Sequence, residues 1–281
     1  MTAAFLDHFV ILVPDLTKGV ETYQKLLGRA CDWQHVTPSD GTATAQFHLA
    51  NTSVELLAPS GDGPVGSRII EILDGREGVL STLAVGTEDI GDAHFTAMRR
   101  GLKPGDVSVQ EARFMGQRKR WSKFRCEDPS LGDVKLFMTA NEGDPRIHIK
   151  APDNAASRVD HLVVNTGNPD RAMAVFGAKL GIRLALDRTN PDWGARFLFF
   201  RLGETTIEFV SRLDGSTPPT APDALWGVTY EVPNLEATHT RLTRAGVEVT
   251  EVKKGRHKGT RVMRVHSGCL SVPTLFLDNN G

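Results

Sequence analysis

The chain has 281 residues, 40% of them hydrophobic and 24% charged, which is typical of a globular protein long enough for two domains. The formal net charge of -1 gives no reason to expect nucleic acid or an anionic membrane as a partner. Three scattered cysteines argue against a disulfide framework, and no leader sequence or apolar run of about 18 residues is visible. The expected location is therefore the cytoplasm.

The first predicted element is a strand at residues 5–13, which are β-branched and aromatic and stop at Pro14. Asp15 offers an N-cap to a helix that has apolar residues at helical spacing and ends before Gly28. Turn-forming residues then separate three strands, expected at 31–37, 43–50 and 52–58. The first module is therefore predicted to have the order βαβββ.

The same order is predicted three more times along the chain. The second module has strands and a helix at 80–87, 90–100 (helix), 106–112, 118–126 and 133–139. The third has them at 158–165, 170–180 (helix) and onward through 211, and the fourth at 226–232, 235–245 (helix), 247–252, 260–266 and 272–278. We expect an α+β protein in which four tandem βαβββ modules form two curved half-barrel sheets with flanking helices. The predicted domains are 1–148 and 157–281.

An internal repeat carries the candidate chemistry. Asp-His-Phe-Val at 7–10 recurs as Asp-His-Leu-Val at 160–163, and Val-Glu-Leu at 54–56 recurs as Ile-Glu-Phe at 207–209, all at the same offset. A duplicated scaffold needs matching glycines, prolines and apolar residues, but it does not need a matching histidine and glutamate. The candidate site residues are therefore His8, Glu55, His161 and Glu208.

Histidine and glutamate among the apolar residues of central strands would be costly to bury alone. A divalent cation, such as Zn, Ni, Fe, Mn or Co, takes neutral imidazole and ionised carboxylate as ligands and offsets the charge. The alternative is a His–Glu hydrogen bond that serves only the core. Modules two and four lack these residues, and an alignment on the helix caps puts Thr82, Lys135, Gly227 and Thr274 at the corresponding positions.

Basic residues gather in the same place in modules two and four. In module two they alternate with aromatic residues, and Arg120, Trp121 and Arg125 are the candidates for binding an anionic substrate. In module four they are Lys253, Lys254, Arg256, Lys258, Arg261 and Arg264. The alternative is an edge strand that lysine and arginine protect from pairing with other chains. His48 is a further candidate ligand or substrate contact.

These motifs resemble the vicinal oxygen chelate superfamily of glyoxalases, bleomycin-resistance proteins, epimerases and extradiol dioxygenases. The resemblance rests on the Asp-His first strand, the Pro-Asp-Leu helix start, the Leu-Gly helix end and the Glu-Leu/Phe fourth strand. Module two, with Arg120-Trp121 and Asp-Pro-Ser-Leu-Gly at 128–132, is similar to the glyoxalase-like domain proteins. The resemblance implies half-barrels around a metal that is bound by a first-strand His and a fourth-strand Glu. The matching residues are His8, Glu55, His161 and Glu208.

The predicted function is a divalent-metal-dependent enzyme acting on a small oxygenated, anionic substrate, with Glu55 or Glu208 as general base. Lyase or isomerase chemistry is favoured over ring cleavage, because the dioxygenases of the superfamily need a first-strand His where module four has Gly227. The alternative is a metal-free small-molecule binding or resistance protein of the same fold. The predicted partner is a small molecule, with a homodimer as an open alternative to a monomer.

Overall fold

The computed structural model describes residues 5–143 and 152–280 and contains the four modules in the predicted order. Module 1 comprises β1 (Phe5–Leu12), α1 (Leu16–Leu27), β2 (Trp33–Thr37), β3 (Thr42–His48) and β4 (Ser53–Pro59), followed by α2 (Pro64–Leu73). Module 2 comprises β5 (Val79–Gly86), α3 (Ile90–Arg99), β6 (Ser108–Phe114), β7 (Gln117–Cys126) and β8 (Lys135–Asn141). A single 3-10 turn, Pro129–Leu131, precedes β8.

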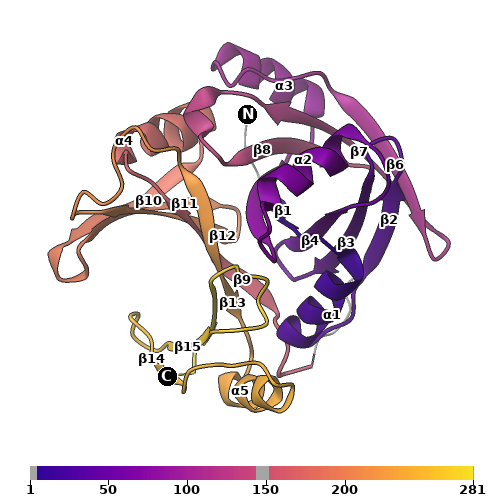
Figure 1. Cartoon of the computed structure of the whole chain (residues 1–281). Coiled ribbons are helices and arrows are strands. Elements are labelled where there is room, and N and C mark those ends of the chain that lie inside the picture. The colour runs from indigo at the N-terminus through magenta and orange to yellow at the C-terminus, as the bar shows by residue number, and fades with distance from the viewer. Residues whose placement is uncertain (1–4, 144–151, 281) are drawn as a thin grey trace. The chain divides into compact units, whose positions relative to one another are not determined.

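The second half of the chain repeats this plan. Module 3 comprises β9 (Arg158–Asn165), α4 (Pro169–Ala172) continued by a π-helical segment (Met173–Lys179), β10 (Arg183–Asn190), a 3-10 turn (Pro191–Trp193), β11 (Ala195–Leu202) and β12 (Thr205–Arg212). Module 4 comprises β13 (Ala224–Glu231), α5 (Leu235–Arg244), β14 (Lys253–Lys254), β15 (Arg261–Val265) and β16 (Thr274–Asp278). Figure 1 shows α4 against one face of β10, β11 and β12.

Hydrogen bonds join the strands of the described residues into two eight-stranded sheets. The first has the order β2-β3-β4-β1-β5-β8-β7-β6, and the second has the order β10-β11-β12-β9-β13-β16-β15-β14. Modules 1 and 2 thus build one sheet and modules 3 and 4 the other, with the first strand of each module at the centre. This arrangement confirms the predicted α+β class and its tandem βαβββ modules.

The contacts within the chain divide it into two compact units. The first unit contains the described residues of Met1–Phe9, Ser81–Pro145 and His161–Trp226, and the second contains those of Val10–Leu80, Arg146–Asp160 and Gly227–Gly281. Module 2 therefore belongs with module 3, and module 1 with module 4. The predicted domain border between 148 and 157 lies partly outside the described residues and stays a prediction.

Each of the four module helices begins at a side-chain cap. Asp15, Asp89, Asn168 and Asn234 each accept a hydrogen bond from the backbone N–H three residues later, at 2.9–3.0 Å. Such a cap satisfies one of the backbone donors that a helix start leaves without a partner. The predicted cap at Asp15 is confirmed, and Gly28 ends α1 in the left-handed conformation that glycine tolerates.

Every module sheet has a core face, which packs under its helix, and an opposite face, which we call the site face. In module 1, Phe47, Val54 and Leu56 lie on the core face and are fully buried, and the ring of Phe47 lies 6.1 Å from that of Tyr23 on α1. Because side chains alternate along a strand, Glu55 lies on the site face.

In module 3 the core face is aromatic. The rings of Phe200 and Phe209 pack against Phe176 of the π-helical segment, with centroid distances of 5.9 and 4.7 Å. The helix predicted at 170–180 is therefore present, but its second half is π-helical. The strand predicted at 247–252 is wrong: only Val249 pairs there, in a single bridge to Val265, and the regular strand that follows is the short β14.

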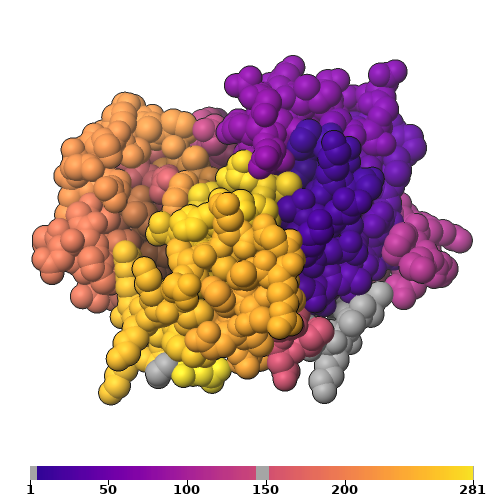
Figure 2. All heavy atoms as spheres, turned by 60° about the horizontal axis from the view of Figure 1, so that its bottom comes forward, coloured from indigo at the N-terminus to yellow at the C-terminus, as the bar shows by residue number. Residues whose placement is uncertain are grey.

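Within the second unit, α5 of module 4 holds the end of α1 of module 1. The guanidinium of Arg241 donates to the backbone carbonyls of Lys25, Leu26 and Asn154, at 3.0 Å to Leu26 and 2.8 Å to Asn154. Burial lowers the pKa of Arg241 to about 10. In Figure 2 the orange and yellow surface of module 4 lies directly beside the indigo surface of module 1.

Replacement of Arg241 by alanine is expected to destabilise the fold. It removes the donors to the carbonyls of Lys25 and Leu26 at the end of α1 and to that of Asn154. A hydrogen bond to a charged group contributes roughly 1.5–3 kcal/mol, and the cost of burying the guanidinium offsets part of the sum, so we expect a net loss of about 2–3 kcal/mol. Urea unfolding of the variant measures this loss. Arg244→Ala, one turn further along and exposed, is the matched control and should change stability by less than about 0.5 kcal/mol. Equal losses in both variants would contradict the role of Arg241.

Candidate metal and substrate site

His161 and Glu208 come together on neighbouring strands of module 3. Strands β9 and β12 run parallel, with His161 opposite Thr206 and Val163 opposite Glu208, so both candidate side chains lie on the site face. The Nε2 atom of His161 lies 3.3 Å from the Oε2 atom of Glu208, and the two side chains are 21% and 14% exposed. The repeat in the sequence therefore identified a pair that is half-buried and in contact.

The separation of this pair fits a shared cation. Imidazole nitrogen and carboxylate oxygen bind Zn²⁺ at roughly 2.0–2.2 Å, so two ligands of a tetrahedral site lie about 3.3–3.6 Å apart. Within residues 5–143 and 152–280, no group of three or more His, Cys, Asp and Glu side chains is arranged to hold a metal ion. The pair supplies two ligands, one fewer than the three protein ligands of a typical catalytic zinc site, so water or substrate oxygens would have to complete the coordination.

One ring nitrogen of His8 in module 1 contacts a carboxylate. Its Nδ1 atom lies 2.6 Å from Asp7 Oδ1, and the other oxygen of Asp7 accepts a hydrogen bond of 2.7 Å from the amide of Asn141. A carboxylate on one ring nitrogen fixes the tautomer of a histidine and makes the other nitrogen the basic one. Within its own unit, His8 is therefore held as an oriented imidazole.

Glu55 lies on β4, the neighbour of β1 in the first sheet. Its Oε2 atom accepts a hydrogen bond of 2.7 Å from the side-chain amide of Gln46, its cross-strand partner on β3. His48 lies two residues further along β3 and therefore also on the site face. Its Nδ1 atom lies 2.8 Å from Ser53 Oγ, and the residue is only 5% exposed.

Two further residues of module 1 share this face. Trp33 pairs with Gln46 across the sheet, and its indole N–H donates to Nδ1 of His35 at 3.1 Å. His35 has no histidine counterpart at the repeat offset, so the repeat alone would not single it out. The alternation of side chains on β2, once paired with β3, is the signal that places it here.

The site face of module 2 carries positive charge and aromatic rings. Strand register places Trp121, Lys123 and Arg125 of β7 on this face, opposite Asn141, Thr139 and Phe137 of β8. The ammonium of Lys123 lies 5.6 Å from the ring centre of Phe137, a cation–π distance. Two of the three predicted substrate-binding residues of this module, Trp121 and Arg125, therefore share the site face.

Arg120, the third predicted substrate-binding residue of module 2, does not lie on the site face. It alternates with Trp121 and so lies on the other face, where it is exposed and forms an ion pair with Glu142 at 2.5 Å.

Strand register also corrects which residue of module 2 corresponds to the repeated glutamate. Glu208 pairs with the residue two after His161, and the same rule applied from Thr82 leads to Phe137 rather than Lys135.

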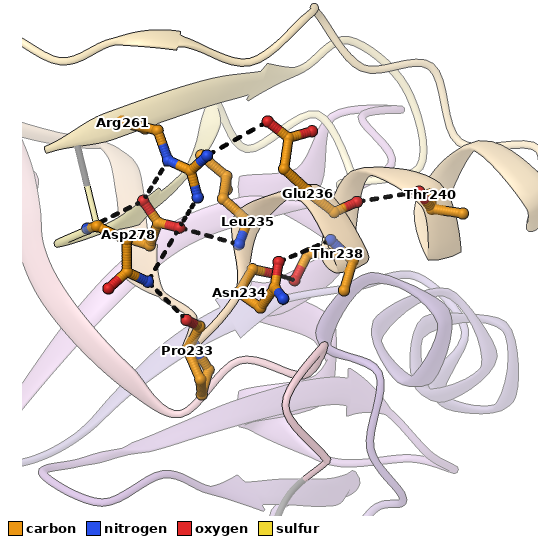
Figure 3. A network of polar contacts seen from close by, with 10 residues as sticks. Pro233, Asn234, Leu235, Glu236, Thr238, Thr240, Arg261 and Asp278 are labelled. Carbon is orange, nitrogen blue, oxygen red and sulfur yellow. Dashed lines mark hydrogen bonds and ion pairs between the residues drawn. The ribbon is translucent and has the colours of Figure 1, made fainter.

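Three of the basic residues of module 4, Arg261, Lys253 and Lys254, have structural roles. Arg261 lies in an ion-pair network with Asp278, at 2.5 Å, and with Glu236 of α5, at 3.4 Å (Figure 3). Burial raises the pKa of Asp278, but the hydrogen bonds from Arg261 and from the backbone of Leu235 outweigh it and hold the pKa below its usual value. Arg261 thus fastens α5 to the sheet. Lys253 and Lys254 are exposed on the edge strand β14, as the edge-protection alternative predicts.

Two family models match the chain. One, described as a glyoxalase-like domain, matches residues 6–157, and the other, described as the glyoxalase/bleomycin resistance protein/dioxygenase superfamily, matches residues 160–263. Among the described residues, no helix is both long and apolar enough to cross a membrane.

Two relatives are epimerases. The ethylmalonyl-CoA/methylmalonyl-CoA epimerase of Cereibacter sphaeroides is 28% identical over 126 residues, which cover 40% of this chain and 93% of the epimerase. The mitochondrial methylmalonyl-CoA epimerase of Homo sapiens is 38% identical over 61 residues, or 21% of this chain and 35% of that protein. A mutant of 4-hydroxymandelate synthase from Streptomyces coelicolor superimposes with a TM-score of 0.71 over 100% of this chain and 94% of its own, at 12% identity. That last likeness concerns the fold alone.

Proposed function

Because the chain belongs to the glyoxalase/bleomycin resistance/dioxygenase superfamily, we propose that it is an enzyme that holds a divalent cation between His161 and Glu208 and acts on a small oxygenated anion. The observation that carries this proposal is the 3.3 Å approach of Nε2 and Oε2 on one half-buried face. When bound, the cation polarises the substrate oxygens that it contacts. His161 would bind it as neutral imidazole, and Glu208 would contribute its carboxylate.

Glu208 would also take the proton that the reaction moves. A general base must lie within hydrogen-bond reach of the carbon acid, and a carboxylate beside the cation meets that requirement for a substrate whose oxygens face the metal. The names of the two epimerase relatives support an isomerase, and Gly227 in module 4 argues against the ligand set of a ring-cleaving dioxygenase. His8 and Glu55 remain predicted ligands, and His48 remains a predicted substrate contact.

The site face of module 2 would recognise the negative charge of a substrate. Arg125→Ala should weaken the binding of a small carboxylate roughly five- to tenfold, because it removes one partly solvated cation from this face. Arg120→Ala is the matched control, since Arg120 lies on the opposite face and is paired with Glu142. Calorimetric titration of both variants with the same carboxylate measures the difference. A loss confined to Arg120→Ala would reverse this assignment.

The competing function is a metal-free binding protein of the same fold, which the lack of a three-ligand cluster in the described residues favours. Elemental analysis of protein purified without added metal, followed by titration with Zn²⁺ and Co²⁺, separates the two. We expect about one equivalent of bound metal per chain, or more. Less than about 0.1 equivalent as purified, with no binding on titration, would overturn the enzyme proposal.

A further inference from the structure

Three polar side chains of the first sheet form a chain of hydrogen bonds that ends at His8. The side-chain amide Nδ2 of Asn141 donates to Asp7 Oδ2 at 2.7 Å, and Asp7 Oδ1 lies 2.6 Å from His8 Nδ1. The side chains of Asp7 and His8 are only 16% and 19% exposed. Both oxygens of the carboxylate are thus engaged in a partly buried place, where polar contacts are stronger than in water.

The amide at one end of this chain belongs to module 2. Asn141 is the last residue of β8, whereas the carboxylate and the imidazole lie on β1, and β5 separates the two strands in the sheet. The pairing of β5 with β8 ends at Gly86 and Thr139, two residues before Asn141. The amide therefore reaches past the end of β5. Asn141 also pairs with Trp121 across β7 and β8, so it links the site face of module 2 with the histidine of module 1.

The matching amide in the C-terminal half is used differently. Aligned on the helix N-caps, Gly86 of module 2 corresponds to Glu231 of module 4, and strand register then makes Asn279 the counterpart of Asn141. Asn279 donates to Glu231 Oε1 at 3.1 Å. Glycine at position 86 offers no such acceptor, so the amide of Asn141 binds Asp7 instead.

The direction of these hydrogen bonds determines which ring nitrogen of His8 carries the proton. An aspartate carboxylate accepts hydrogen bonds and donates none, so Nδ1 of the neutral ring is the protonated nitrogen and Nε2 keeps the lone pair. Only a nitrogen with a lone pair can bind a cation. The amide of Asn141 holds the second oxygen of the carboxylate, and outer partners of this kind orient the histidine that a metal binds.

We propose that Asn141 is a positioning residue, which acts through Asp7 to hold His8 as the Nδ1-protonated tautomer, so that Nε2 offers its lone pair to a ligand. The use of Nε2 rests on the proposed function, in which His8 is a predicted metal ligand, whereas the tautomer does not depend on it. Module 2 thereby sets the state of a histidine in module 1. Because Glu231 takes the matching amide in module 4, we assign this role to the N-terminal half.

The test determines the tautomer from ¹⁵N NMR spectra of the full chain labelled at its histidines, at the alkaline end of their titration, where the rings are neutral. Protonated and unprotonated ring nitrogens have well-separated ¹⁵N shifts, and the signals of His8 are those lost in His8→Asn. We expect wild-type His8 to be protonated on Nδ1. In Asp7→Asn, the oxygen of the introduced amide should accept from Asn141, which turns its NH₂ group toward Nδ1 of His8. The tautomer should therefore reverse, with a change of roughly tenfold or more in the ratio of the two forms.

The most informative variant exchanges the two side chains. In Asp7→Asn/Asn141→Asp, the carboxylate at position 141 accepts from the amide NH₂ at position 7, so the amide oxygen faces Nδ1 of His8. The Nδ1-protonated tautomer should return, although composition and net charge match those of the wild type. A role of Asn141 in folding alone predicts no reversal and no recovery. Asn279→Ala, at the matching position of module 4, is the control and should leave the signals of His8 unchanged.

Addition of Zn²⁺ to the same samples separates this inference from the proposed function. We expect the Nε2 signal of wild-type His8 to shift with the metal. The affinity at His8 should fall roughly 10- to 100-fold in Asp7→Asn and recover in the exchange variant. Wild-type His8 protonated on Nε2, or a tautomer that is the same in all these proteins, would overturn the inference. The expected tautomers, without any response of His8 or His161 to Zn²⁺, would support the positioning role and overturn the proposed function.

Discussion

His161→Ala is expected to lower the affinity for Zn²⁺ or Co²⁺ by at least about 100-fold. Loss of an outer hydrogen-bond partner of a metal ligand typically costs 10- to 100-fold in affinity, and the loss of a ligand itself should cost no less. The effect is large because the described residues contain no group of three or more His, Cys, Asp and Glu side chains arranged to hold a metal ion, so the pair has no third ligand of this kind to retain the cation. Competition with a chromophoric chelator gives the dissociation constants of both proteins.

The control for this variant is His266→Ala. His266 is exposed, has no counterpart at the repeat offset and lies outside the site faces described above. Its removal should leave the affinity unchanged. Equal metal affinities in the wild type and His161→Ala, with both proteins folded by circular dichroism, would refute the ligand role of His161.

Glu208→Gln is expected to slow proton exchange at the carbon next to the substrate carbonyl or carboxylate by roughly 10²- to 10⁴-fold, the range that a positioned general base contributes. Glutamine keeps the shape of the side chain and an oxygen that can face the cation, but it cannot accept the proton. Exchange of substrate hydrogen for deuterium in D₂O, followed by NMR, measures the step directly. Metal content determined on the same samples separates the loss of the base from the loss of the cation.

The comparison variant is Glu55→Gln. Glu55 occupies the same place in the repeat but is bound by the amide of Gln46, whereas Glu208 faces His161. We therefore expect the larger loss from Glu208→Gln. A rate unchanged in Glu208→Gln and abolished in Glu55→Gln would assign the reaction to the N-terminal half and contradict the account.

The sequence was sufficient to predict the modules and to single out His161 and Glu208, which lie in contact, because duplication leaves a signal at every equivalent position. It could not determine which face a strand residue occupies where the pattern of apolar residues does not alternate. The sequence offered no reason to distinguish Arg120 from Arg125. In the structure, Arg120 pairs with Glu142, whereas Arg125 lies on the site face. The side of His48 became clear only from its pairing with Ser53.

Local patterns also failed where tertiary packing decided the outcome. Residues 247–250 alternate valine with polar residues, as a strand does, but within 247–252 only Val249 finds a bridge partner. In module 4 the run of basic residues suggested a substrate surface, but an acidic partner far along the chain, Asp278, engages Arg261. Phenylalanine on a strand normally indicates core, and only the register separates Phe199, on the face of Glu208, from Phe200 on the core face.

The most direct test of the central claim is anomalous diffraction from a crystal of the full chain grown with Co²⁺. The account predicts an anomalous peak that contacts both Nε2 of His161 and the carboxylate of Glu208, at roughly 2.0–2.3 Å from each. A peak found only elsewhere, or none at this pair under saturating metal, would show that the 3.3 Å contact is a hydrogen bond within the fold and that the proposed metal site does not exist.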